Sequence, residues 1–123
     1  MFFEMSEFAC RCGCGENRVH PTLVAMMERT REIAGVPIVL NRGCSCSEHN
    51  KKVGGSDTSS HLIGDDWFCT AVDIKTANSV CRWKILDAAI KAGFKRVGIG
   101  KNFIHLDIDR KKSSGVIWTY YDK

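Results

Sequence analysis

The sequence lacks the features that mark several special classes of protein. It has no apolar run near 20 residues, the length that a transmembrane helix requires, and it has no repeat or low-complexity tract. The first ten residues, MFFEMSEFAC, have neither a basic start nor a long apolar stretch, so they do not read as a secretory signal. We therefore expect a chain that is made in the cytoplasm without a signal peptide and has no membrane partner.

A strong excess of one charge is also missing. The formal net charge is only +4, which fits attraction to a polyanion but is too small to indicate nucleic-acid binding. A length of 123 residues is enough for one hydrophobic core and too short for two. We therefore predict a single domain over residues 1–123.

Cysteine, by contrast, is abundant. Five of the seven cysteines form two tight groups, Cys10-x-Cys12-x-Cys14 and Cys44-x-Cys46. An odd count without a signal peptide argues against a full disulfide framework. Thiolates suit zinc, although this spacing is not the usual C-x2-C. The two groups could therefore hold a second, structural metal, form a disulfide with each other, or remain free thiols.

The order of predicted elements favours an α+β fold. Long helices are predicted over residues 21–34, between Pro21 and Gly35, and from Asn78 or Ser79 to about residue 92; Ser47 caps a short helix between them. Short apolar runs predict five strands, at residues 36–40, 70–74, 96–99, 103–108 and 116–120. Because the strands lie mostly after the helices, we predict a small antiparallel sheet with helices packed on one side.

Two of these strands carry polar residues on one face. Residues 103–108 read FIHLDI, so the aliphatic side chains on one face require the core and His105 and Asp107 lie on the other. Asp73, in the strand sequence AVDI, is likewise opposite its aliphatic neighbours. Burial of an ionised aspartate costs on the order of several kcal/mol, because the carboxylate loses its hydration, unless another group compensates its charge.

A metal ion would supply that compensation. If the two strands are neighbours, Asp73 and His105 meet, and His61 in the preceding loop completes a set of three ligands. Three protein ligands leave one tetrahedral position open for water, as a catalytic zinc site requires. The alternative from spacing alone is that each histidine is an ordinary surface or core residue.

Several short motifs occur in a fixed order along most of the chain. They are Gly35–Leu40, His49–Gly55, Ser59–Gly64, Ala71–Ile74, Gly98–Gly100 and Phe103–Asp107. Together they resemble the family M15 zinc peptidases, which include D-alanyl-D-alanine carboxypeptidases and phage cell-wall endopeptidases and share a fold with the hedgehog signalling domain. The opening FACRCGCGENRVHPTLV also resembles the phage-encoded branch.

The resemblance implies a site and a reaction. By it, His61, Asp73 and His105 carry over as ligands of one catalytic zinc ion. The implied reaction is hydrolysis of peptide bonds in peptidoglycan stem peptides or cross-links near D-alanine, as in a phage lysin. Zinc would activate a water molecule and polarise the carbonyl, while a carboxylate would move the proton. We expect a monomer that acts at the cell wall or in a phage particle, with no nucleic-acid partner.

The chain departs from the family pattern near the site. Residues 65–70 lengthen the interval between the first two ligands, His61 and Asp73. Trp67 in this interval and Ser60 just before His61 are candidate substrate-binding residues, although Trp67 could instead cap the core. Ser45 stands where family members commonly have an arginine that binds substrate or the oxyanion, so Arg42 is the candidate replacement.

The catalytic base is the third departure. Asn102 stands where many members carry an acid, and asparagine cannot be a base. Asp107 is the predicted base and Asp65 or Asp66 come next; alternatively, Asp107 only orients a ligand histidine.

These departures favour one rival function. The chain could be a catalytically weak or inactive zinc-binding module of the same fold, for example a virion component. A zinc-ribbon-like nucleic-acid adaptor built on the cysteines is a further hypothesis, which the mild charge disfavours.

Overall fold

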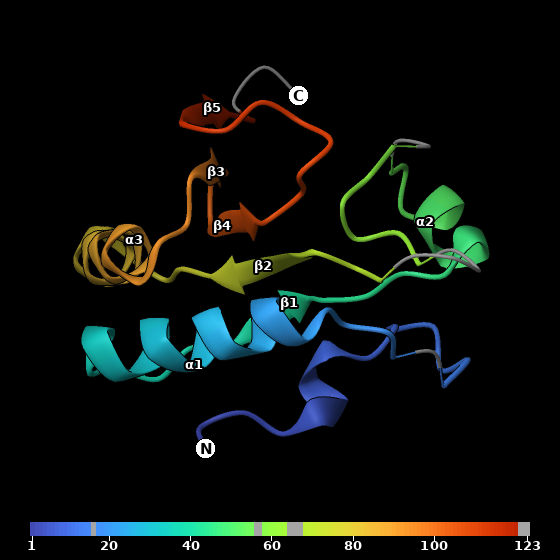
Figure 1. Cartoon of the computed structure of the whole chain (residues 1–123), viewed down its shortest axis with the longest axis horizontal. Helices are drawn as coiled ribbons and strands as arrows, with labels where there is room; N and C mark the ends of the chain where they lie inside the picture. Colours follow the sequence, from blue (N-terminus) through green and yellow to red (C-terminus); the bar gives the residue numbers. More distant parts are fainter. Residues whose placement is uncertain (16, 56–57, 64–67, 121–123) are drawn as a thin grey trace.

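The computed structural model describes residues 1–15, 17–55, 58–63 and 68–120 and shows the predicted α+β fold (Figure 1). Its elements, in chain order, are η1 (Met5–Phe8), α1 (Pro21–Ala34), β1 (Leu40–Arg42), α2 (Ser47–Lys52), β2 (Ala71–Lys75), α3 (Ser79–Ala92), β3 (Arg96–Ile99), β4 (Phe103–Asp107) and β5 (Val116–Thr119). None of the helices described is long and apolar enough to cross a membrane.

The strands form one sheet in the order β1-β2-β4-β3-β5. The predicted antiparallel pairing holds for β1–β2, β2–β4 and β3–β4, but β3 and β5 are parallel. The parallel pair follows from the topology. Since β2 and β3 already occupy both edges of β4, the returning β5 pairs with the outer edge of β3, and both run antiparallel to β4.

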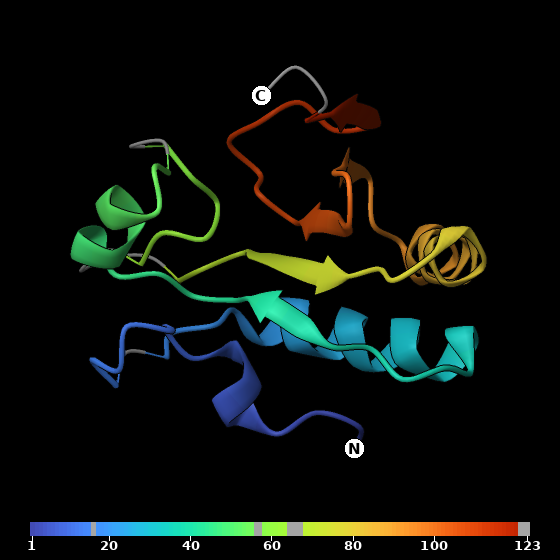
Figure 2. The ribbon, with the colours of Figure 1, turned by 180° about the vertical axis from the view of Figure 1, so that it is seen from behind.

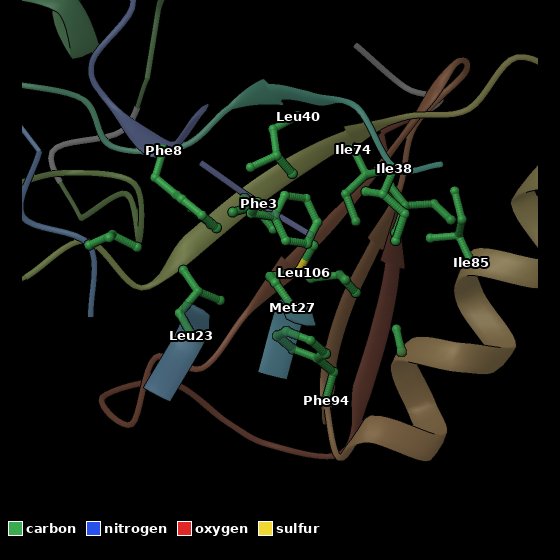
Figure 3. Packing of buried hydrophobic residues seen from close by; sticks show 14 of the residues in the cluster. Phe3, Phe8, Leu23, Met27, Ile38, Leu40, Ile74, Ile85, Phe94 and Leu106 are labelled. Atoms are coloured by element: carbon green, nitrogen blue, oxygen red, sulfur yellow. The ribbon is translucent and has the colours of Figure 1, made fainter. Parts of the chain in front are cut away.

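The two long helices cover one face of this sheet. Side chains of α1 and α3 meet the aliphatic side chains of β2 and β4 in a single core, in which Leu23, Met27, Ile85, Ile74 and Leu106 are buried (Figure 3). The opposite face of β2 and β4 is therefore free of these helices and can carry polar groups.

The ends of both helices lie where the sequence predicts them. Pro21 is the first residue of α1, and Gly35 ends it with φ of 65°, a left-handed conformation that favours glycine. Asn78 caps α3 by accepting a hydrogen bond from the Cys81 amide, and Gly93 ends the helix with φ of 107°.

Three local predictions were wrong. The short helix α2 is capped by Cys46 rather than by Ser47, which is its first residue, because Cys46 Sγ accepts a hydrogen bond from the His49 amide. The first strand is Leu40–Arg42 rather than residues 36–40, because the ladder with β2 begins only at Val39 and Leu40, beyond Pro37, which has no N–H to donate. The hydrophobic spacing of α3 predicts a packed face that includes Val80, Trp83 and Ile90, but these side chains are 66%, 67% and 52% exposed.

Candidate metal centre

The register of the sheet brings together two of the predicted ligands. Asp73 of β2 and His105 of β4 are directly paired, so their side chains are neighbours on the face opposite the long helices. His105 Nδ1 lies 2.9 Å from Asp73 Oδ1. The alternation of FIHLDI and AVDI therefore has the predicted consequence that both polar side chains lie on one face.

The third predicted ligand, His61, comes from the segment between α2 and β2. Its Nε2 atom lies 3.2 Å from Asp73 Oδ1, and its carbonyl accepts a hydrogen bond from the Ser45 amide at 2.8 Å. Its Nδ1 atom lies 2.7 Å from the Gly43 carbonyl oxygen. That carbonyl can only accept a hydrogen bond, so Nδ1 carries the proton and the Nε2 lone pair faces Asp73.

These three side chains fit a tetrahedral metal ion. Their ligand atoms all lie within 4.8 Å of one another, and the two distances to Asp73 Oδ1 are 3.2 and 2.9 Å. Zinc bonds of about 2.0–2.1 Å at tetrahedral angles would separate neighbouring ligand atoms by about 3.3 Å. Two imidazole nitrogens and one carboxylate oxygen are also a donor set that zinc accepts, with one position left open.

Asp107 fixes the orientation of the second histidine. Its Oδ2 atom lies 2.7 Å from His105 Nε2, and Arg96 Nε donates to its Oδ1 atom at 2.7 Å. A proton held on Nε2 leaves the Nδ1 lone pair for a cation beside Asp73, an arrangement common around metal-bound histidine. Asp107 has the hydrogen bonds of an orienting residue, and its prediction as general base stays a prediction.

The charges around the centre suit a cation. Burial would raise the pKa of Asp73, but hydrogen bonds with His105 and His61 hold it well below its usual range, so the carboxylate is ionised. Burial lowers the pKa of His61, which keeps its Nε2 lone pair available. The pKa of His105 is raised: burial opposes this, but hydrogen bonds to Asp107 and Asp73 outweigh it. A cation between His105 and Asp73 would replace the shared proton.

Arg42, the predicted replacement for the family arginine, lies beside the centre. It is paired with Asp73 across β1 and β2. Its Nε donates to Ser45 Oγ at 2.9 Å and its Nη2 to Asn50 Oδ1 at 2.9 Å, which holds the guanidinium in place. Ser45, at the family's arginine position, is thus a partner of the arginine that lies three residues earlier.

Two aromatic side chains that were not predicted from the sequence border the centre. The ring centroid of His105 lies 5.5 Å from that of Trp118 and 6.5 Å from that of Tyr120. We call Trp118 and Tyr120 the aromatic wall. They lie over Gly98, where an added Cβ would come within 2.7 Å of Tyr120 and 2.8 Å of Trp118. Their spacing in the sequence predicts a shared face, but only the pairing of β5 with β3 shows that this face is the one with His105.

A cleft of about 1280 Å³ adjoins the centre on the side of Asp107. The predicted substrate-binding residue Ser60 lines it and donates to Asp109 Oδ2 at 2.9 Å. Several cationic side chains also line it, namely Lys95, Arg96, Arg110, Lys111 and Lys112. The other predictions for this region, Trp67, Asp65 and Asp66, lie outside the described residues.

The structure groups the cysteines differently from their spacing in the sequence. The sulfur atoms of Cys10, Cys12, Cys14 and Cys46 all lie within 4.8 Å of one another. Cys44 is fully buried with its thiol toward Asn17, and it is not part of the metal-ligand groups found among the described residues. Cys46 instead caps α2, where its Sγ accepts a hydrogen bond from the His49 amide and lies 3.8 Å from Cys10 Sγ.

One comparison with known proteins found a match. A family model described as Peptidase M15 matches residues 1–107, a span that includes the three residues of the candidate metal centre and Asp107. A search of curated proteins found no match.

Proposed function

The chain belongs to the peptidase M15 family, and on this premise we propose that it is a zinc-dependent peptidase that hydrolyses peptide bonds near D-alanine in peptidoglycan stem peptides or cross-links, as a phage lysin does. The observation that carries the proposal is the open ligand set of His61, Asp73 and His105. The nitrogens that would bind metal are already directed by the hydrogen bonds of the other ring nitrogens.

Zinc held by these residues would supply a Lewis acid and a water molecule acidic enough to ionise near neutral pH. The chain's own groups would do the rest. Arg42 carries a positive charge beside Asp73, where it can bind the oxygen that gains charge as the peptide bond is attacked. The aromatic wall limits access of bulk water to His105 and gives the substrate an apolar surface.

The cleft supports a peptide substrate that carries carboxylates. The cleft is lined by five lysine and arginine side chains and by the two carboxylates of Asp107 and Asp109, so a substrate carboxylate that enters it would meet net positive charge. Stem peptides of peptidoglycan carry free carboxylates. The net charge of +4 adds weak attraction to the anionic wall.

The test is incubation of zinc-loaded protein with purified peptidoglycan, followed by labelling of new amino termini. We expect release by the wild type and none by Asp73→Asn, which removes the negative charge of the carboxylate that contacts both histidines. Asp87→Asn is the matched control, since Asp87 pairs only with Lys91 on the surface of α3 among its described ion pairs. Release by Asp73→Asn at the wild-type rate would refute the proposal.

A second candidate function is favoured by the surroundings of Asp107. Its carboxylate already contacts His105, Arg96 and the Asp109 amide, and Asn102 has no acid to offer. Within the described residues, the only carboxylate grouped with the two histidines as a metal ligand is Asp73. The second candidate is therefore a zinc-binding module of the same fold that lacks catalytic activity. Such a module would sediment with peptidoglycan in a zinc-dependent manner and yet release no amino termini.

A further inference from the structure

The segment after η1 and the start of α2 lie at the end of the molecule opposite α3 (Figure 2), and four cysteine sulfur atoms of these two segments lie close together. Cys10, Cys12 and Cys14 belong to the N-terminal segment that follows η1, and Cys46 caps the start of α2. The Sγ atom of Cys10 lies 3.4 Å from that of Cys12 and 3.8 Å from that of Cys46, and the Cys12 and Cys46 sulfurs are 3.7 Å apart. We call these four residues the cysteine cluster.

These separations match the edges of a tetrahedron of sulfur around zinc. With zinc–sulfur bonds of about 2.3 Å, tetrahedral geometry places sulfurs about 3.8 Å apart. We propose that the cysteine cluster binds a second zinc ion, with a structural role, at a site separate from His61, Asp73 and His105. Four thiolates close the coordination sphere, so this site would leave no position for a substrate or a reactive water.

The glycines of the segment explain how an unusual spacing can form such a site. In an extended strand, the Cα atoms of alternate residues lie about 7 Å apart, so a turn between two such cysteines makes it easier for their sulfurs to reach one ion. Gly13 and Gly15 have φ of 85° and 83°, a left-handed conformation that glycine adopts readily. Gly13 separates Cys12 from Cys14, so the turn there draws the three cysteines around one point.

A disulfide explains the cluster less well. One disulfide would use two sulfurs and leave the other two thiols at similar distances without a role, whereas one ion uses all four. Backbone amides also donate to the sulfurs: Cys46 N to Cys10 Sγ at 3.4 Å, and His49 N to Cys46 Sγ at 3.4 Å. Such donors stabilise negative charge on a thiolate and orient it as a ligand.

The position of the cluster indicates what the ion would stabilise. Cys46 follows Ser45 directly, and Ser45 exchanges backbone hydrogen bonds with the segment of His61: its amide donates to His61, and its carbonyl accepts from Ile63. On the other side, the Cys44 amide donates to the Phe8 carbonyl at 2.8 Å. An ion at the cluster would fasten the N-terminal segment to the turn that holds His61.

Metal content measured by mass spectrometry of the purified protein tests the proposal. We expect two zinc ions per chain in the wild type, and one in both Cys12→Ser and Cys46→Ser. Cys81→Ser is the matched control and should retain two, because Cys81 lies on α3 outside the cluster. Asp73→Asn should lose the other ion, so a failure at one site is distinguishable from a failure at the other.

Alkylation of the wild type avoids any effect of substitution on folding. Cys12 and Cys14 are exposed, so as free thiols they would react at once with iodoacetamide. We expect neither to be labelled in the purified protein and both to be labelled after a zinc chelator is added. Equal labelling with and without chelator would overturn the proposal. Iron in place of zinc, or loss of two hydrogen masses to a disulfide within the cluster, would overturn it as well.

Discussion

Replacement of Asp107 by asparagine separates the two roles that the carboxylate could have. In the structure, Asp107 accepts a hydrogen bond from His105 Nε2 through one oxygen and from Arg96 through the other. Asparagine has only one acceptor. If its oxygen faces His105, its amide opposes the Arg96 donor; if it is reversed, its amide donates to Nε2 and favours the tautomer with a proton on Nδ1.

Either orientation weakens the metal centre. A proton on Nδ1 must leave before that nitrogen can bind zinc beside Asp73, and the loss of the Arg96 bond lets the ring turn. Removal of such an orienting partner typically costs about 10–100-fold in metal affinity, or roughly 1.4–2.7 kcal/mol. We therefore expect Asp107→Asn to bind zinc at the His-Asp-His centre about 10–100-fold more weakly than the wild type.

The assay is a competition titration against a zinc chelator of known affinity, made with the Cys46→Ser substitution in both proteins so that only one site is read. Asp109→Asn is the matched control: its side chain bonds Ser60 and Lys112, and its contact with Asp107 is through the backbone amide. Unchanged zinc affinity in Asp107→Asn, together with a loss of kcat at full zinc occupancy, would refute the orienting role. That result would support Asp107 as the general base.

Two further predictions concern the walls of the centre. Gly98→Ala forces a methyl group against the aromatic wall, so we expect a loss of about 1–3 kcal/mol in the free energy of unfolding by urea. Thr119→Ala, an exposed change on β5, should stay within about 0.5 kcal/mol, and equal effects would contradict the steric argument. Arg42→Lys keeps the charge but loses the planar group that makes two side-chain hydrogen bonds, so we expect kcat on peptidoglycan peptides to fall about 10²–10³-fold with zinc content unchanged. Arg29→Lys, on the exposed surface of α1, is the control for that measurement, and an equal fall there would exclude a specific role for Arg42.

Local patterns in the sequence determined several parts of this protein. Pro21 and Gly35 define the ends of α1. Proline suits the first helical position, where its missing N–H is not needed, and glycine readily adopts the left-handed conformation that ends the helix. The alternation in FIHLDI assigns His105 and Asp107 to the polar face, since a strand has a period of two residues. The order of motifs led to the peptidase M15 family, which the match over residues 1–107 shows.

The tertiary structure decided which of these polar groups meet and in what role. The sequence does not state that β4 lies between β2 and β3, and only this order brings Asp73, His105 and the aromatic wall together. Nor does it show that Arg96 and His105 both hydrogen-bond the carboxylate of Asp107. That contact places the proton of His105 on Nε2 and leaves Nδ1 for a metal ion.

The cysteines illustrate the same division. Spacing alone groups Cys44 with Cys46, yet the fold buries Cys44 beside Asn17 and turns Cys46 toward Cys10 and Cys12. Helix ends and strand faces depend on a few neighbouring residues, so they can be read from sequence. A metal centre depends on distances between side chains from separate segments, and packing of the whole chain sets those distances.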